Sequence, residues 1–245
     1  MIVADSIHNR DPSFLKKKWV GCFVVFPFVI LGLGTLLFHF SDFDVTISLL
    51  FFKENQGFSL KSTQPWLFFY RHGNVPGLLI GFFGLFLISA RLIWKRIGAH
   101  WKTGFFLVLL LIIGPGLIVN TVFKGHWGRP RPVEIVDFGG EQRYRPVWQK
   151  GIAGQGKSFP SGHASIGYYL MAPFFFLYPM GFKRWGIFFL IVGLAYGTTM
   201  GIGRIVQGAH FASDVLWSAG FVYFTGLVLA SFFRFDRMGQ DIGKL

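Results

Sequence analysis

Six long apolar runs constrain the fold of this chain more than any other feature. A helix that crosses a bilayer needs roughly 20 mostly apolar residues, because each residue adds only about 1.5 Å of rise. The runs cover about 19–40, 75–94, 103–123, 161–181, 185–203 and 211–233. Charged residues make up 14% of the chain, against roughly 25% in soluble domains. The sequence therefore predicts an all-α, multi-pass membrane protein with six transmembrane helices in one domain, residues 1–245.

Six crossings put both chain ends on one side of the membrane, and the basic residues predict which side. Of the 24 lysines and arginines, 13 flank the helices on the side of the termini: Arg10, Lys16–Lys18, Arg91, Lys95, Arg96, Lys102, Lys183, Arg184, Arg234, Arg237 and Lys244. By the positive-inside rule, both termini are predicted to be cytoplasmic. The first run is too long for the core of a signal peptide, so we expect a retained helix.

The opposite side carries more basic residues than topology requires. In its first loop, about 41–74, three bases are balanced by three acids: Lys53, Lys61 and Arg71 against Asp42, Asp44 and Glu54. Seven further bases fall between residues 124 and 157. In a soluble protein such a surface would suggest nucleic acid, but beside a membrane it suits an anionic lipid headgroup. We expect no nucleic-acid partner. The aromatic stretch Trp66–Tyr70 fits either an interfacial belt or a substrate contact.

Three polar clusters lie where the predicted helices meet this outer surface. They are Lys124–Pro132 after the third helix, Ser158–His163 at the start of the fourth, and Gly203–Asp214 between the fifth and sixth. The topology derived from charge places all three on one face of the membrane. This agreement predicts a shared site.

Phosphate is the ligand that these clusters suit. Lys124, Arg131 and Arg204 supply fixed positive charges, and the planar guanidinium of arginine matches two phosphate oxygens at once. Ser161 and Gly162 open the fourth predicted helix, where backbone N–H groups and the helix dipole favour an anion. These five residues form the predicted phosphate-binding set.

Two histidines and one aspartate provide the reactive groups. His163 and His210 can serve as nucleophile and proton donor near neutral pH. Asp214 is the only acid inside a predicted span, and a charge there is usually functional. Because His210 and Asp214 are four residues apart, a helix would place them on one face. We expect Asp214 to accept a hydrogen bond from Nδ1–H of His210 and so fix its tautomer.

The same inventory argues against a metal or any other cofactor. Magnesium-dependent phosphoryl transfer uses clustered carboxylates, whereas these clusters contain one. Two histidines and an aspartate could ligate zinc, but three neighbouring cations oppose it. Cys22 is the only cysteine, so a cysteine-type metal site is excluded.

The spacing resembles the three-part signature of the phosphatidic acid phosphatase type 2 (PAP2) superfamily. The parts read here as Lys124, six residues and Arg131-Pro132; then Pro160-Ser161-Gly162-His163; then Arg204, five residues, His210, three residues and Asp214. The spacing selects Arg131 over the neighbouring Arg129. One departure is Gly203, where the family usually has serine; it removes one hydroxyl donor but none of the principal groups.

This resemblance implies a metal-independent phosphatase that works in two steps. His210 would attack phosphorus to form a phosphohistidine, His163 would protonate the leaving oxygen, and water would hydrolyse the intermediate. The charge on the equatorial oxygens would be stabilised by Lys124, Arg131, Arg204 and the amides of Ser161 and Gly162. Soluble vanadium haloperoxidases share the signature, but six spans favour the membrane branch.

A further stretch is similar to the bacterial lipid A 4′-phosphatases of this superfamily. It comprises Gly114–Asn120, Phe123–Val133, Gln207-Gly208, His210-Phe211 and Ser213–Val215. The similarity implies lipid A as substrate and a periplasmic active site in the bacterial inner membrane. Candidate headgroup-binding residues are His126, Arg129, Arg143 and Arg145. The alternative is a solvated basic loop that faces anionic lipids.

Several alternatives stay open from the sequence. An apolar groove accepts any acyl or prenyl chain, so undecaprenyl diphosphate and phosphatidylglycerophosphate are candidate substrates beside lipid A. A lipid phosphotransferase would use the same residues. A transporter is the non-enzyme alternative, although transporters keep polar residues near the midplane and these lie at the outer ends. The sequence indicates no obligate protein partner.

Overall fold

The computed structural model describes residues 21–94 and 100–236, and the regular elements within these ranges are helical. The prediction of an all-α fold is therefore confirmed. Residues 19 and 20 of the first apolar run lie outside the described residues. So do eight of the basic residues used for the topology: Arg10, Lys16–Lys18, Lys95, Arg96, Arg237 and Lys244.

The elements are labelled α for α-helices and η for 3₁₀- and π-helices. The first half contains η1 (Gly21–Val25), α2 (Phe26–Phe40), α3 (Phe43–Leu49), η2 (Ser59–Ser62), α4 (Trp66–His72), α5 (Val75–Ile93), α7 (Trp101–Leu111) and η3 (Ile112–Phe123). The second half contains α8 (Lys124–His126), η4 (Pro132–Glu134), η5 (Val136–Phe138), α9 (Gly162–Tyr168), η6 (Tyr169–Met171), α10 (Phe174–Leu177), α11 (Lys183–Val206) and α12 (Ala212–Phe233).

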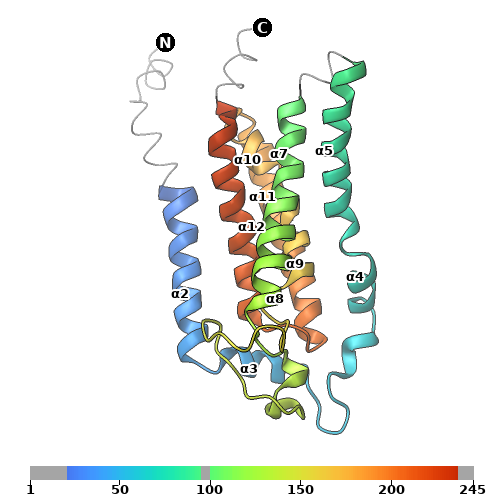
Figure 1. The fold of residues 1–245 in the computed structure, drawn as a ribbon, viewed down its shortest axis with the longest axis vertical. Helices are drawn as coiled ribbons and strands as arrows, with labels where there is room; N and C mark the ends of the chain where they lie inside the picture. Colours follow the sequence, from blue (N-terminus) through green and yellow to red (C-terminus); the bar gives the residue numbers. More distant parts are fainter. Residues whose placement is uncertain (1–20, 95–99, 237–245) are drawn as a thin grey trace, which may run out of the picture.

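Five helical stretches of the described chain are long and apolar enough to cross a membrane. They are Gly21–Phe40, Trp66–Ile93, Trp101–His126, Lys183–Val206 and Ala212–Phe233. They run alongside one another, and the first begins at the same end of the molecule at which the last finishes (Figure 1). Their outward side chains are apolar: Phe82, Leu92 and Phe232 are 64%, 88% and 75% exposed. Such a surface matches hydrocarbon and not water.

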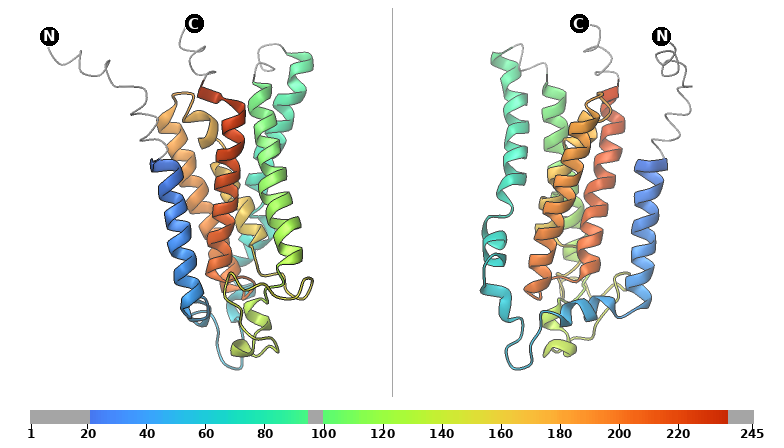
Figure 2. Two further views of the ribbon diagram at one scale, coloured as in Figure 1. Left: turned by 60° about the vertical axis from the view of Figure 1, so that its left-hand side comes forward. Right: turned by 180° about the vertical axis from the view of Figure 1, so that it is seen from behind.

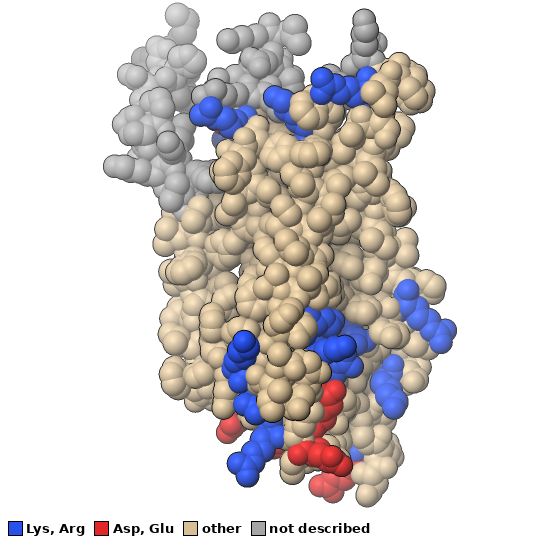
Figure 3. All heavy atoms as spheres, in the orientation of Figure 1, with Lys and Arg blue, Asp and Glu red and all other residues tan. Residues whose placement is uncertain are grey.

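Charge is distributed as the bilayer requires. On the face shown in Figure 3, lysine, arginine, aspartate and glutamate side chains gather toward the two ends, and a broad belt between them is uncharged. The acidic side chains visible on this face lie at the end opposite the start of α2 and the end of α12 (Figures 1 and 3). The chain is thus a multi-pass membrane protein.

The fourth predicted helix, 161–181, differs from the prediction of one continuous span. It is divided into α9, η6 and α10, with Pro173 directly before α10. Proline lacks an N–H and interrupts the helical hydrogen-bond ladder. The segment still passes from one end of the molecule toward the other (Figure 1). Most of it is buried against α11, α12 and α5, and broken helices are tolerated at membrane depth where protein encloses them.

The third predicted helix is also irregular. It continues from α7 into the π-helix η3, which contains the sequence Gly114-Pro115-Gly116. The side-chain amide of Asn120 donates to the Pro115 carbonyl at 2.7 Å. Proline-disrupted helices are stabilised by such polar side chains.

The end of the bundle opposite Gly21 is covered by irregular chain. α3 lies across this end, beside the loop that leads from α8 to α9 (Figures 1 and 2). Phe58, Ile135, Phe138 and Phe211 form a small apolar cluster there, separate from the main core between the helices. This cluster holds the loops over the ends of α11 and α12.

Candidate active site

The three polar clusters meet at this loop-covered end. Lys124 lies in α8, Arg131 precedes η4, and Arg204 lies in the last turn of α11. Lys124 interacts electrostatically with both arginines, and these interact with each other. All three are half-buried. The fold therefore gathers like charges from distant parts of the sequence, which is unfavourable unless an anion joins them.

These cations have no carboxylate partners. Among the described residues, the only lysine or arginine within salt-bridge distance of an acid is Arg129. The Nε atoms of Arg131 and Arg204 are buried and make no hydrogen bond. A buried donor without a partner costs about 1–3 kcal/mol. The predicted cations Lys124, Arg131 and Arg204 are thus arranged to receive acceptor oxygens.

Gly162 leaves room for two side chains at the start of α9. A Cβ at this position would collide with the Asn120 amide oxygen and lie 3.1 Å from Nζ of Lys124. Because glycine has no Cβ, Lys124 and Asn120 can both approach the start of α9.

Ser161 differs from its predicted role as a phosphate ligand. Its backbone N–H donates to Oγ of Ser218 at 2.9 Å, and its own Oγ caps α9 at Ala164 N. The residue is completely buried. Ser161 therefore anchors α9 to α12. Because its backbone N–H already donates to Ser218, the Gly162 amide is left as the predicted donor toward phosphate.

A backbone carbonyl orients His210. We had expected Asp214 to accept the hydrogen bond from its Nδ1–H instead. Its Nδ1 lies 2.5 Å from the Ser158 carbonyl oxygen and 3.7 Å from Oδ2 of Asp214. The reason is the start of α12: the helix begins at Ala212, so His210 lies before it and does not share a helical face with Asp214. Nδ1 of His210 is still within ion-pair distance of Asp214, and a second link passes through the Ser158 hydroxyl, which donates to Oδ2 of Asp214 at 2.5 Å.

This geometry defines the protonation state of His210. A carbonyl oxygen can only accept, so Nδ1 carries the proton and the neutral ring has its lone pair on Nε2. The pKa of His210 is lowered to about 4: burial is the largest cause, Asp214 opposes it, and the charges of Lys124 and Arg204 add to the lowering. The imidazole is therefore neutral at pH 7, in the tautomer that a nucleophile needs.

His163 is held by an aromatic side chain from another helix. Its ring stacks on Tyr70 of α4, with centroids 5.3 Å apart and an interplanar angle of 25°. The Arg204 guanidinium lies over the same tyrosine, 4.8 Å from the ring centroid. Tyr70 thus contacts both a predicted proton donor and a predicted phosphate ligand. This favours a role for the Trp66–Tyr70 stretch in substrate contact over a role as an interfacial aromatic belt.

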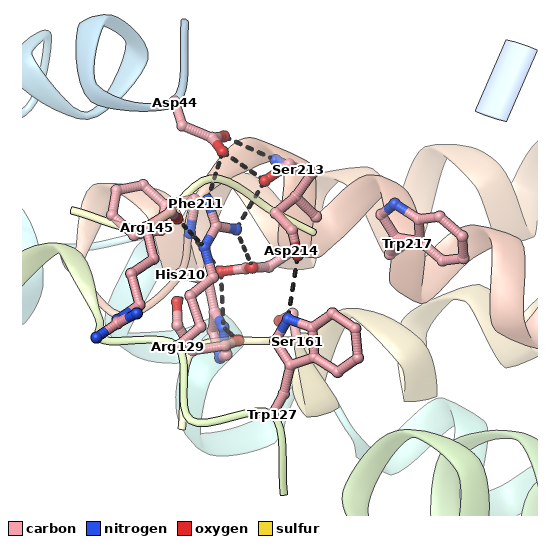
Figure 4. Close-up of polar contacts among 12 residues, drawn as sticks. Asp44, Trp127, Arg129, Arg145, Ser161, His210, Phe211, Ser213, Asp214 and Trp217 are labelled. Carbon is pink, nitrogen blue, oxygen red and sulfur yellow. Dashed lines mark hydrogen bonds and ion pairs between the residues drawn. The ribbon is translucent and has the colours of Figure 1, made fainter. Parts of the chain in front are cut away.

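We had predicted that Arg129 binds the substrate headgroup, but its side chain does not face the headgroup side. It is completely buried, with Nη2 2.7 Å from Oδ2 of Asp44 and Nη1 2.5 Å from Oδ1 of Asp214 (Figure 4). Its Nε donates to the Arg145 carbonyl at 2.9 Å. Burial alone would lower the pKa of Arg129, but the carboxylates of Asp214 and Asp44 outweigh burial and raise it. The guanidinium is therefore always charged.

The sequence did not single out Asp44. We had only counted its charge against the basic residues of its own loop, whereas the structure pairs it with Arg129, 85 residues away. The partner could not be found from spacing, because no local pattern links the two residues. A weak signal existed, since Asp44 lies between Phe43 and Val45 in an apolar stretch.

The other candidate headgroup residues stay at the surface. His126 and Arg143 are exposed, and Arg145 is half-buried. Nδ1 of His126 lies 3.0 Å from the Val122 carbonyl of its own helix. The Arg145 side chain points away from the buried network around Arg129 (Figure 4). These three residues therefore remain predictions as headgroup contacts.

Comparison with known proteins agrees with the signature. The model of the PAP2 superfamily matches residues 104–237, more than half of the chain. The chain belongs to the PAP2 superfamily. The match contains all the signature positions from Lys124 to Asp214, and the resemblance seen in the sequence is confirmed.

Relatives of this PAP2 chain are bacterial. The lipid A 4′-phosphatase of Francisella tularensis subsp. novicida is 38% identical over 152 residues, covering 61% of this chain and 67% of the relative. That of Rhizobium etli is 29% identical over 247 aligned positions, covering 88% and 94%. The lipid A 1-phosphatase of Rhizobium etli is 27% identical over 198, covering 80% and 68%. No solved structure gives a significant match. With the PAP2 signature, these matches identify a phosphoric monoester hydrolase.

Proposed function

We propose that this PAP2 protein removes a phosphate from lipid A at the periplasmic face of the bacterial inner membrane, without a metal, through a phosphohistidine on His210. The observation that carries the proposal is the state of His210. Its Nδ1–H is held by the Ser158 carbonyl. This leaves Nε2 available near Lys124 and Arg204, which have no carboxylate within salt-bridge distance among the described residues.

The reaction balances with these residues alone. Nε2 of His210 attacks phosphorus, the bond between phosphorus and the lipid oxygen breaks, and His163 gives that oxygen a proton. A water then attacks the phosphohistidine and passes a proton to His163, and phosphate leaves. Lys124, Arg131 and Arg204 stabilise the charge on the equatorial oxygens. Among the described residues, no three histidine, cysteine, aspartate or glutamate side chains converge as metal ligands would.

A groove beside the site suits a hydrocarbon chain. It has a volume of about 450 Å³ and is lined by η3, from Ile112 to Thr121, together with Leu111 and Ile166. Asn120 lines the groove and also approaches Gly162. Ile112 and Leu117 are 56% and 48% exposed, so the groove is open toward lipid. We assign it to an acyl chain of the substrate.

The test is phosphate release by the purified protein in detergent with EDTA present. The panel contains lipid A carrying both phosphates, undecaprenyl diphosphate and phosphatidylglycerophosphate, with His210→Ala as the inactive control. We expect lipid A to be hydrolysed fastest, and mass spectrometry of the product shows which phosphate was removed. Activity that disappears with EDTA would contradict metal independence, and a faster prenyl or glycerol lipid would replace lipid A. Phosphate transfer to an added lipid, without release, would identify a phosphotransferase.

A further inference from the structure

A buried carboxylate outside the signature reaches the catalytic residues. Asp44 of α3 is completely buried. Its Oδ2 accepts from Nη2 of Arg129 at 2.7 Å and from the Ser213 hydroxyl at 2.5 Å. Its Oδ1 accepts from the Ser213 backbone N–H at 2.9 Å. Asp44 thereby holds both the arginine that binds Asp214 and the residue immediately before Asp214 (Figure 4).

From Arg129, contacts continue without a break to His210. Nη1 of Arg129 donates to Oδ1 of Asp214, and the Ser158 hydroxyl donates to Oδ2. The carbonyl of that same serine accepts the Nδ1–H of His210. Each residue in this chain of contacts fixes the next. A shift of Arg129 would therefore displace Asp214 and then Ser158, and would change the tautomer of the histidine. Buried polar networks of this kind act as a unit.

The charges in this network explain why Asp44 is needed. With Asp214 alone, the buried Arg129 guanidinium would be held on one side only. With Asp44, both of its Nη atoms carry a charged acceptor, and its plane is fixed between two helices. The Phe211 ring also lies against it, 4.5 Å from Cζ to the ring centroid. A guanidinium that bonds two carboxylates is held more rigidly than one that bonds a single carboxylate.

We propose that Asp44 is a positioning residue for the reaction: through Arg129 and Ser213 it fixes Asp214 and Ser158, and so keeps His210 in its nucleophilic tautomer. This inference rests on the proposed function of His210. Asp44 makes no hydrogen bond or ion pair with Lys124, Arg131 or Arg204 in the described chain. It therefore acts on the chemical step and not on phosphate binding.

The test compares Asp44→Asn with Asp42→Asn. Both remove one carboxylate charge from the same segment, but Asp42 is exposed and its side chain makes no capping bond to α3. For Asp44→Asn we expect kcat to fall at least 10-fold while KM stays within twofold. For Asp42→Asn we expect both constants to match the wild type. A kcat within twofold of wild type for Asp44→Asn, or a rise in KM alone, overturns the proposal.

A second readout does not depend on turnover. NMR of ¹⁵N-histidine-labelled protein, with His210→Gln to identify the signal, should show an Nδ1–H tautomer for His210 in the wild type and a mixture in Asp44→Asn. An unchanged His210 signal overturns the proposal even if kcat falls, because the loss would then not pass through His210. If the wild type hydrolyses no lipid, the proposed function fails, and this signal still decides the role of Asp44.

A milder variant tests the same proposal if Asp44→Asn does not fold. Ser213→Ala removes the hydroxyl that bonds both Asp44 and Arg129 but leaves every charge in place. We expect a fall in kcat of at least threefold with KM unchanged and a shifted His210 signal. Wild-type kcat and an unshifted signal in this variant overturn the proposal.

Discussion

Arg129 and Arg131 show how local surroundings assign different tasks to identical side chains. Arg129 and Arg131 both precede a proline and stand two residues apart. Arg129 is enclosed between two carboxylates, whereas Nε of Arg131 is buried without a partner. One guanidinium stabilises the protein, and the other is available to a ligand.

This contrast predicts opposite effects for one substitution. Arg129→Met leaves two buried carboxylates unpaired, so the free energy of unfolding should fall by about 3–5 kcal/mol. Arg131→Met removes hydrogen bonds only to the bound phosphate, at about 1.5–3 kcal/mol, so kcat/KM should fall roughly 10- to 100-fold with unchanged stability. Thermal unfolding in detergent and steady-state kinetics measure the two effects. Equal thermal midpoints for both variants would contradict the assignment.

The second prediction at this scale concerns the pKa of His210. Burial holds the pKa near 4, below the ordinary value of about 6.5, so the neutral ring should persist as the pH falls from 7 to 5. Protonation should begin only below about pH 5. NMR titration of the His210 signal in substrate-free protein measures this directly. A midpoint for His210 near 6.5 would show that it is solvated.

The residues that sequence reasoning identified are those with a fixed spacing. Lys124, Arg131, Arg204 and both histidines were found because the signature fixes their distances along the chain. Asp44 and Ser158 were not singled out, because their importance depends on contacts across 85 and 52 residues. The orientation of His210 was wrong because it depended on whether α12 begins before or after residue 210.

At the scale of helices, small residues decide how closely the crossings pack. A Cβ at Gly193 of α11 would fall on the backbone nitrogen of Met171 in η6. A Cβ at Gly32 of α2 would meet nothing within 4 Å. The broken fourth crossing can therefore lie directly against α11, whereas α2 leaves space beside Gly32. In membranes, such close approach is a principal source of helix association.

Alanine substitutions at these two glycines should have opposite effects. Gly193→Ala forces two backbones apart and should lower the free energy of unfolding by about 1–3 kcal/mol. Gly32→Ala should raise it by up to about 1 kcal/mol, because alanine is the better helix former. Thermal unfolding of both variants in one detergent tests the pair. If Gly193→Ala unfolds at or above the wild-type midpoint, the close contact between α11 and η6 is wrong.

The groove along η3 leads to a prediction about substrate length. Gly116→Leu places a side chain in it, so KM for a long-chain lipid phosphate should rise several-fold. A water-soluble phosphate monoester should be hydrolysed as by the wild type, because the site at Lys124 is untouched. Steady-state kinetics with both substrates distinguish the two effects. Equal changes for both would place the acyl chain elsewhere.

Hydropathy predicted the positions of the crossings well but not their regularity. The ends of α5, α11 and α12 lie within about three residues of the predicted bounds. Hydropathy measures only whether a segment avoids water, so it could not distinguish a lipid-facing helix from the enclosed, divided segment 161–181. Pro173 lies within this segment, but the effect of a proline depends on whether neighbouring helices compensate for the lost hydrogen bond.

At the scale of the whole molecule, the site and the described ends of the chain lie at opposite ends of the bundle (Figure 1). If the bases near the chain ends are cytoplasmic, the site is periplasmic. Impermeant maleimide should therefore label Glu54→Cys in intact cells and Lys183→Cys only after lysis, both in a Cys22→Ser background. Glu54 and Lys183 are exposed, and Cys22 is an exposed free thiol. The reverse labelling pattern would place the site in the cytoplasm.

The buried pair of Asp44 and Arg129 should constrain how the sequence of this protein can change in evolution. Either residue alone would leave a charge stranded in the protein interior, so neither can be lost first without harm. Among related sequences, we therefore expect Asp44 and Arg129 to be inherited or replaced together, even where the signature itself does not change. The loop after the first crossing should then evolve as slowly as the catalytic loops, although it contains none of their motifs.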